Sequence, residues 1–492
     1  MSADCEEGQS VTDQPAAGDE VIKQYRGAIF EIGGHDQFER LRQRYRGEPP
    51  EKKVREPRDD WTEELRKLQV KVGTLLKTDT VSFLFGAGVS KDCGGVLFGS
   101  VPKEIERVLL GAGVKDGEPE SVAAWLKLFY LAAKEASQGS AAAPISDEAI
   151  IERGSNLEGA EPLSVNFEAL VSQIYRWRHA AGVSASCIVD LKTEWAQVTM
   201  SGDDIRRCLD NVNKALANVL DLPLPGKEDG LEIFKVFLRK LLTRPLNLKR
   251  ASLFTLNYDT LLEKAADAEG IFLVDGFAGT LRRVFRPETY DQDLYFPAQT
   301  TEGRVHRYDR VLHLYKLHGS LAWMSEEPSL DNPFGISAGN RPFGDSPIIY
   351  PTPSKFGDVL GMPYAELFRR FAGAVVRPQS TLFAIGYGFG DEHVNAIIRQ
   401  AFAVPSFTMV VVAPTVDNHF VSTVRSKGDS RLWVLSGETL GTFAGFVAHA
   451  MPDLREESIQ ERVRATYTAL GVSPDGPQQE ERRAEEGGAD DE

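Results

Sequence analysis

Short apolar runs alternate with segments of helical periodicity along most of this chain. The run Val81–Phe85 has the length and composition of a strand buried on both faces of a parallel sheet. Comparable runs predict further strands at Ala251–Thr255, Leu312–Leu317, Thr381–Ile385, Thr408–Val412 and Leu432–Leu435. Helical patterns separate several of them, at Thr260–Ala268, Tyr364–Val375 and His393–Ala403. This alternation predicts an α/β fold, with a mostly parallel sheet and helices on both faces.

The long interval between the first two predicted strands is dominated by helical spacing. Apolar residues recur in this way at Pro102–Leu110, Val122–Ala136, Asn166–Ile174, Cys187–Leu220 and Leu231–Leu242. The pattern predicts a helical insertion over about residues 100–245. A separate helical domain would give the same pattern.

Composition divides the chain into three parts. Residues 1–60 contain a polar, acidic start and a charged linker at 48–53, and are expected to be disordered or partly ordered. Residues 61–445 hold all the predicted strands and form the expected catalytic domain. Residues 446–492 are expected to form a C-terminal helix and an acidic disordered tail from about Ser473. Between the predicted strands, residues 282–310 are expected to be a loop or short hairpin.

Charge and cysteine usage narrow the possible function classes. The 492 residues carry a formal net charge of -16, which disfavours a broad nucleic-acid-binding surface. No apolar stretch reaches the ~20 residues of a membrane span, and the start does not resemble a secretory signal. The cysteines are Cys5, Cys93, Cys187 and Cys208, with no C-x-x-C pair. This usage predicts a cytoplasmic protein without a cysteine zinc site.

Four short motifs follow predicted strands and carry residues suited to binding or catalysis. They are Gly86-Ala87-Gly88-Val89-Ser90, Thr255-Leu256-Asn257-Tyr258-Asp259, His318-Gly319 and Gly386-Tyr387-Gly388-Phe389-Gly390-Asp391. Glycines after a strand let backbone N–H groups approach an anion. The carboxyl ends of parallel strands share one edge of a sheet, where ligands bind in such folds. The motifs are therefore expected to meet at one crevice.

Each motif alone also has a purely structural explanation. Asn257, Asp259 and Asp391 are residue types that favour turns and helix N-caps. A histidine such as His318 is often a hydrogen-bonded core residue, and the first glycines would suit any tight strand-to-helix turn. These explanations do not account for the joint occurrence of all four motifs.

In this order, the motifs resemble the sirtuin (Sir2) superfamily, and more closely its bacterial antiphage branch. The forms GAG-x-S, T-x-N-Y-D and GYGFGDEHVN are typical of that branch, and NFEALVSQI at 166–174 resembles one of its helical stretches. The resemblance implies a Rossmann-like domain that binds NAD as a substrate. It also implies an NAD+ nucleosidase, or glycohydrolase, which releases nicotinamide and ADP-ribose.

The resemblance also implies a role for each matching residue. Asn257 would hold the attacking water or the ribose hydroxyls, and His318 would act as the general base. Asp259 would bind the nicotinamide carboxamide, with Gly319 also at the nucleotide. The pyrophosphate would be cradled by Gly86, Ala87, Gly88 and Ser90. The adenosine half would lie near Gly386, Gly388 and Asp391.

Several features depart from the protein-deacylating sirtuins. No cysteine follows Cys208, so the four-cysteine zinc module of those enzymes is absent from the sequence, and neither zinc nor another metal is expected. The glycine motif is not followed by the usual proline within Gly94–Phe98, nor by an Asp-Phe-Arg stretch. The interval from Asn257 to His318 is also longer, because it includes residues 282–310. These departures disfavour deacylation.

Three readings of function remain from the sequence. The first is an NAD+ hydrolase that depletes NAD in antiphage defence by abortive infection. The second is a regulatory module that binds NAD or ADP-ribose derivatives without turnover, and the third is an NAD-dependent deacylase or ADP-ribosyltransferase. A homo-oligomer is expected by resemblance, with a HerA-type hexameric ATPase or a phage protein as a partner or trigger. No membrane is expected as a partner, and direct nucleic-acid binding is not expected.

Overall fold

The computed structural model describes residues 27–44, 57–113, 122–137, 143–144, 146–157, 163, 165–181, 188–192, 197–297, 305–339 and 362–455. The predicted N-terminal tail up to residue 20, the linker at 48–53 and the acidic tail from Ser473 lie outside these residues.

A nine-stranded sheet forms the centre of the molecule, with strand order β2-β1-β17-β16-β15-β3-β6-β12-β7. Its strands are β1 (Ile29–Ile32), β2 (His35–Asp36), β3 (Thr80–Phe85), β6 (Ser252–Thr255), β7 (Phe272–Val274), β12 (Val311–Lys316), β15 (Ser380–Ile385), β16 (Thr408–Val412) and β17 (Leu432–Ser436). The strands from β17 to β7 pair in parallel, whereas β1 and β2 add antiparallel strands at one edge. All six strands predicted from the sequence are present, and the mostly parallel α/β sheet is confirmed.

The inner strands run in the order β12-β6-β3-β15-β16-β17. This is the doubly wound order 3-2-1-4-5-6 of a Rossmann-like sheet. Its switch point lies between β3 and β15, because the chain moves from β3 toward β12 and later returns to build outward from β15. The loops after β3 and β15 leave in opposite directions and open a crevice there.

Helices cover both faces of this sheet. Along β3, Phe83 and Phe85 belong to the core on one face, beneath α3 (Pro57–Leu76), α9 (Gly230–Leu241) and α10 (Leu261–Glu269). Leu84 points to the opposite face and packs in the core that includes residues of α12, α13 and α14. These helices span Tyr364–Val375, Glu392–Phe402 and His419–Arg425. The last described segment, with α15 (Gly437–Leu440), α16 (Phe443–Gly445) and the π-helical turn η4 (Phe446–Ala450), packs on the first face.

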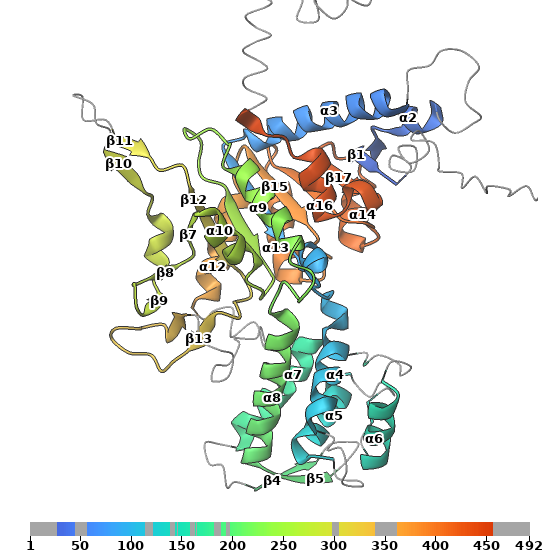
Figure 1. Ribbon diagram of the computed structural model, residues 1–492, viewed down its shortest axis with the longest axis vertical. Helices are drawn as coiled ribbons and strands as arrows, with labels where there is room; N and C mark the ends of the chain where they lie inside the picture. The colour runs from blue at the N-terminus through green and yellow to red at the C-terminus, as the bar shows by residue number, and fades with distance from the viewer. Residues whose placement is uncertain are drawn as a thin grey trace, which may run out of the picture.

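A second body of helices projects from one end of the sheet (Figure 1). It contains α4 (Val101–Gly113), α5 (Ala124–Ala136), α6 (Asp147–Ser155), α7 (Phe167–Ala181) and α8 (Gly202–Leu220), which share one apolar core. We call these helices the helical bundle. Inside it, fully buried Glu106 accepts hydrogen bonds from Arg153 and from the Tyr130 hydroxyl, so the buried carboxylate is paired.

The prediction of an unbroken helical pattern over Cys187–Leu220 is wrong at its start. Strands β4 (Ile188–Lys192) and β5 (Gln197–Ser201) form an antiparallel hairpin at the far tip of the helical bundle (Figure 1). Their β-branched residues favour strands. Helix α8 begins only after Ser201, where Ser201 and Asp204 form a reciprocal capping box. Helix α9 packs on the sheet instead of the helical bundle.

The segment predicted as a loop or short hairpin contains more structure than expected. It includes β9 (Arg283–Phe285), the 3-10 turn η3 (Pro287–Asp291), and the hairpin of β10 (Tyr295–Pro297) and β11 (Val305–Arg307). Strand β9 joins β8 (Phe277–Ala278), β13 (Trp323–Ser325) and β14 (Ile336–Ala338) in a small second sheet. Three short elements complete the described chain: α2 (Glu39–Arg44) and the 3-10 helices η1 (Ala87–Cys93) and η2 (Phe98–Ser100). None of the described helices combines the length and apolarity needed to cross a bilayer.

Candidate active site

A cavity of about 930 Å³ lies at the switch point of the sheet. Its walls come from the loops that follow β3, β6, β12, β15 and β16, and from the helical bundle. Nearly all the predicted site residues line it: Gly86, Ala87, Gly88, Ser90, Asn257, Asp259, His318, Gly386, Gly388 and Asp391. The predicted convergence of the four motifs on one crevice is therefore observed. The roles assigned to the individual residues stay predictions.

Gly319 is the one predicted site residue that is not among the cavity-lining residues. It has a φ of 90° in the turn directly after His318. Glycine is the residue that adopts this conformation without strain, so its evident function is to form the turn that presents His318.

The glycines after β3 and β15 interlock. A Cβ on Gly86 would lie 2.5 Å from the Gly386 carbonyl oxygen, and one on Gly88 would lie 2.8 Å from the Gly386 Cα. The Gly88 N–H donates to the Gly386 carbonyl over 3.0 Å, and Gly386 itself has a φ of 61°. The close approach of two loops, rather than a ligand alone, therefore requires glycine at these positions.

Gly388 and Gly390 lie in a different environment. Both line the cavity, and a Cβ built on either would meet no atom within 4 Å. They border open space that a larger side chain would fill. This space is therefore open to a ligand that enters the cavity.

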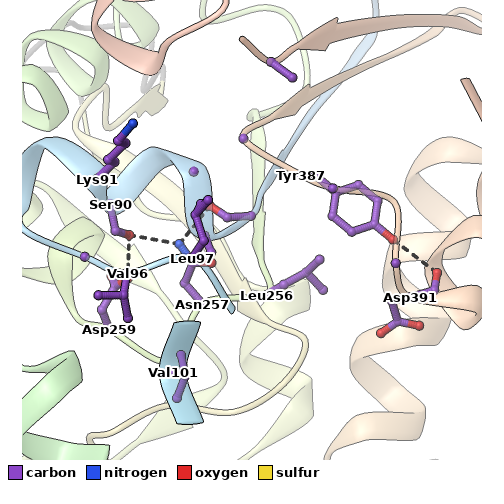
Figure 2. A pocket seen from close by; sticks show the side chains of 18 of the residues that line it. Ser90, Lys91, Val96, Leu97, Val101, Leu256, Asn257, Asp259, Tyr387 and Asp391 are labelled. Carbon is purple, nitrogen blue, oxygen red and sulfur yellow. Dashed lines mark hydrogen bonds between the residues drawn. The ribbon is translucent and has the colours of Figure 1, made fainter. Parts of the chain in front are cut away.

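Ser90, Asn257 and Asp259 form a hydrogen-bonded group on the opposite side of the cavity from Tyr387 and Asp391 (Figure 2). The Ser90 hydroxyl donates to Asp259 Oδ2 over 2.7 Å and accepts from Asn257 Nδ2 over 3.1 Å. Asn257 Nδ2 also donates to the Gly86 carbonyl over 3.1 Å. The amide N–H groups of Asn257 are thus directed to the protein, which assigns its Oδ1 as the acceptor for a ligand hydroxyl or water.

Asp259 has a structural role as well as a place in the cavity wall. Its Oδ1 accepts from the Leu261 N–H over 3.2 Å at the start of α10, so the predicted turn-forming role is also observed. Its backbone carbonyl accepts from buried Lys316, which donates in addition to Glu263 over 2.8 Å. Lys316 thereby holds the turn after β6 against the end of β12, two residues before His318. Burial raises the pKa of Glu263.

His318 is buried and lies beside Asp391. Its Nε2 is 2.9 Å from Asp391 Oδ2, across the loops that follow β12 and β15. The sequence analysis made His318 the general base and placed Asp391 near the adenosine half; the structure brings these two side chains into direct contact. Asp391 Oδ1 accepts from the N–H groups of His393 and Val394, so Asp391 also caps α13, as the structural explanation expected.

The helical bundle supplies an apolar wall that the sequence analysis did not assign to the site. From the helical bundle, Val101, Phe167, Leu216 and Leu220 line the cavity, and Val96 and Leu97 join them from the segment before η2. Figure 2 shows Val96, Leu97 and Val101 on the side of the cavity that carries Asn257. Tyr258 and Leu321 pack into the apolar core of the helical bundle. Helical spacing predicted these faces as core, and no sequence signal identified the part that borders the cavity.

The sequence analysis also did not assign the part of the cavity wall that follows β16 and β17. Its lining includes Pro414, Thr415, Asp417 and Asn418 after β16, and Thr442 before α16. These residues form no recognisable motif in the sequence. They would have been found only by noting that the ends of β15, β16 and β17 share one edge.

No group of three or more His, Cys, Asp or Glu side chains within the described ranges could hold a metal ion. Cys93 is fully buried, and burial raises the pKa of its thiol to about 12. A thiol with this pKa stays protonated at neutral pH and is a poor nucleophile.

Comparison with known proteins gives one family. Residues 251–427 match the SIR2-like domain, and this match supports membership of the Sir2 superfamily. The matched region includes Asn257, Asp259, His318 and Asp391, whereas the first glycine motif precedes it. The match fits a function that involves NAD. A comparison with curated proteins found no match.

Proposed function

We propose that this chain is an NAD+ hydrolase that converts NAD+ and water to nicotinamide, ADP-ribose and a proton. One observation carries the proposal: Asn257 and His318, from the ends of two neighbouring strands, line the same cavity as the interlocked glycines at the switch point. The SIR2-like match over residues 251–427 supports NAD as the ligand.

In this proposal, an extended dinucleotide lies in the cavity in one orientation. The pyrophosphate would lie at the turn Gly86–Gly88, which lines the cavity at the crevice between β3 and β15. The nicotinamide ribose would lie at Asn257 and His318, with the nicotinamide ring toward the apolar wall of the helical bundle. The adenosine would then extend toward residues 413–418.

The proposed reaction depends more on the orientation of water and substrate than on a strong acid or base. The C–N bond between ribose C1′ and nicotinamide breaks, and its electron pair neutralises the pyridinium ring of the leaving group. The sugar develops oxocarbenium character, as in glycoside cleavage. Asn257 Oδ1 orients the attacking water, whose oxygen forms the new bond to C1′, while His318 accepts its proton.

The test is release of nicotinamide and ADP-ribose from NAD+, followed by mass spectrometry. Asn257→Ala and His318→Ala are each expected to lower kcat by about 10²–10⁴-fold, the usual contribution of a positioned general base or orienting group. His419→Ala, which removes an exposed histidine outside the cavity, is the matched control. Unchanged turnover in both site variants would contradict the assignment.

The same assay separates the two alternatives. NAD binding without turnover under every condition, including added partners, would favour a regulatory binding module. Nicotinamide release that requires an acyl-lysine peptide or a protein acceptor would favour a deacylase or ADP-ribosyltransferase.

The cellular part of the proposal extends the resemblance to antiphage sirtuin-like proteins. NAD depletion would act in the cytoplasm as abortive infection, and such an activity must be held off in healthy cells. Homo-oligomerisation, a HerA-type hexameric ATPase or a phage protein would supply the control. Purification with the products of neighbouring genes, followed by the NAD assay, tests for such a partner.

A further inference from the structure

The pair formed by His318 and Asp391 joins the two sides of the switch point. His318 follows β12, whereas Asp391 lies in the loop between β15 and α13. Their side chains are only 11% and 12% exposed, and the Nε2–Oδ2 distance is 2.9 Å. A hydrogen bond between such groups is strong and directional when water is excluded.

The carboxylate of Asp391 is fixed by contacts on its own loop. Its Oδ1 accepts from the His393 N–H over 2.9 Å and from the Val394 N–H over 3.4 Å. The Tyr387 hydroxyl donates to the Asp391 carbonyl over 3.1 Å. The Asn395 side chain donates to the Phe389 carbonyl over 2.9 Å, which holds Phe389 at a φ of 55°. With Oδ1 committed to the helix cap, Oδ2 is the oxygen presented to His318.

This arrangement determines which imidazole nitrogen carries the proton. A carboxylate accepts hydrogen bonds but does not donate them, so the hydrogen bond requires a proton on Nε2 of His318. The lone pair then lies on Nδ1, which is the nitrogen left to accept a proton. We propose that Asp391 is the positioning residue of His318: it holds the Nε2–H tautomer and stabilises the imidazolium formed when Nδ1 takes a proton. The stabilisation of the imidazolium during the reaction rests on the proposed NAD+ hydrolysis, whereas the assignment of the proton to Nε2 does not.

Two substitutions at position 391 separate positioning from helix capping. In Asp391→Asn, the side-chain oxygen is expected to keep the two cap hydrogen bonds, because turning the amide over would lose both. The NH₂ group then faces Nε2 as a donor and forces the proton of His318 onto Nδ1. In Asp391→Ser, the hydroxyl still caps the helix, and His318 is left without a fixed tautomer.

The tautomer is read directly by NMR of protein labelled with ¹⁵N-histidine, with the His318 signals assigned from His318→Gln. The wild type is expected to show Nε2–H and the Asp391→Asn variant Nδ1–H, both without substrate. In the NAD assay, Asp391→Asn is expected to lower kcat by about 10³–10⁴-fold with KM nearly unchanged, as wrong-tautomer variants of other His–Asp pairs do. Asp391→Ser is expected to lose less activity than Asp391→Asn, although asparagine is closer in shape to aspartate.

The control is Asp203→Asn, which removes a half-buried carboxylate outside the cavity, in the first turn of α8, and should change neither readout. An Nε2–H tautomer in the Asp391→Asn variant, or equal kcat losses in the asparagine and serine variants, would overturn the inference. A merely structural role predicts that asparagine is tolerated better than serine. If the wild type cleaves no NAD under any condition, the proposed function fails, and the tautomer experiment still decides the role of Asp391.

Discussion

At the residue scale, two glycines that each follow a strand have different surroundings. Gly86 faces the backbone of the loop after β15, whereas Gly388 faces open cavity space. The sequence analysis assigned both to the nucleotide and offered a plain tight turn as the alternative explanation for the first motif. The structure shows that the loop contact alone demands glycine at position 86.

This difference predicts opposite outcomes for two alanine variants. Gly86→Ala places a methyl group 2.5 Å from the Gly386 carbonyl oxygen and is expected to lower the free energy of unfolding by about 3 kcal/mol. Gly388→Ala is expected to fold normally and to bind ADP-ribose about 10-fold more weakly, because its methyl group enters the cavity. Urea denaturation and isothermal titration calorimetry measure the two quantities.

The control for these variants is Gly373→Ala, within α12. A Cβ there also meets no atom within 4 Å, but Gly373 is not among the residues that line the cavity. It should leave ADP-ribose affinity unchanged and stabilise the helix slightly. Normal stability of Gly86→Ala would show that the two loops can separate, contrary to their observed contact.

At the element scale, β12 contains a half-buried histidine, with a buried Nε2 atom, that makes stability depend on pH. His313 lies in the middle of β12. Desolvation by burial lowers the pKa of its imidazole from 6.5 to about 4. Its Nε2 has no hydrogen-bond partner among the residues that the structure describes. The folded protein therefore holds a neutral imidazole where the unfolded chain would bind a proton.

The expected consequence is a loss of stability in mild acid. Between pH 6.5 and about 4, the unfolded chain takes up a proton at His313 that the folded protein does not. The free energy of unfolding should therefore fall with decreasing pH, by up to about 3 kcal/mol from this group. His313→Gln cannot titrate and should flatten this part of the pH profile, measured by urea denaturation at several pH values.

His419→Gln removes an exposed histidine from α14 and is the matched control, which should keep the wild-type slope. A wild-type slope in His313→Gln would mean that other groups cause the acid sensitivity.

At the scale of the whole molecule, the cavity connects the sheet to the helical bundle. Phe167, at the start of α7, lines the cavity together with the loops at the strand ends. Tyr258, between Asn257 and Asp259, packs into the core of the helical bundle. A ligand that fills the cavity must therefore contact both bodies.

Hydrogen exchange can test this connection and the proposed direction of the nucleotide. ADP-ribose is expected to slow exchange in residues 86–95, 257–261 and 386–395. AMP alone is expected to protect residues 413–418 and 441–443 without protecting the helical bundle. Protection of the first turn of α7 by AMP would reverse the proposed direction, and protection by NAD confined to the sheet would contradict a shared cavity.

The sequence predicted the sheet well because buried parallel strands are short, continuous apolar runs. It predicted the hairpin of β4 and β5 wrongly, since polar and apolar residues there also fit helical spacing. The small sheet of β8, β9, β13 and β14 was missed because its strands are two or three residues long and joined by long-range pairing. Short strands depend on partners distant in the sequence, and no local pattern records them.

The candidate site also has a part that the sequence predicts and a part that it does not. By itself, the sequence determined which residues stand at strand ends, because glycine, asparagine, aspartate and histidine interrupt apolar runs there. Only the tertiary structure decided that Gly86 meets Gly386, that Asp391 reaches His318 and that the helical bundle closes one side of the cavity. These contacts join residues separated by tens to hundreds of positions, and their geometry arises from the strand order of the sheet, which local sequence does not encode.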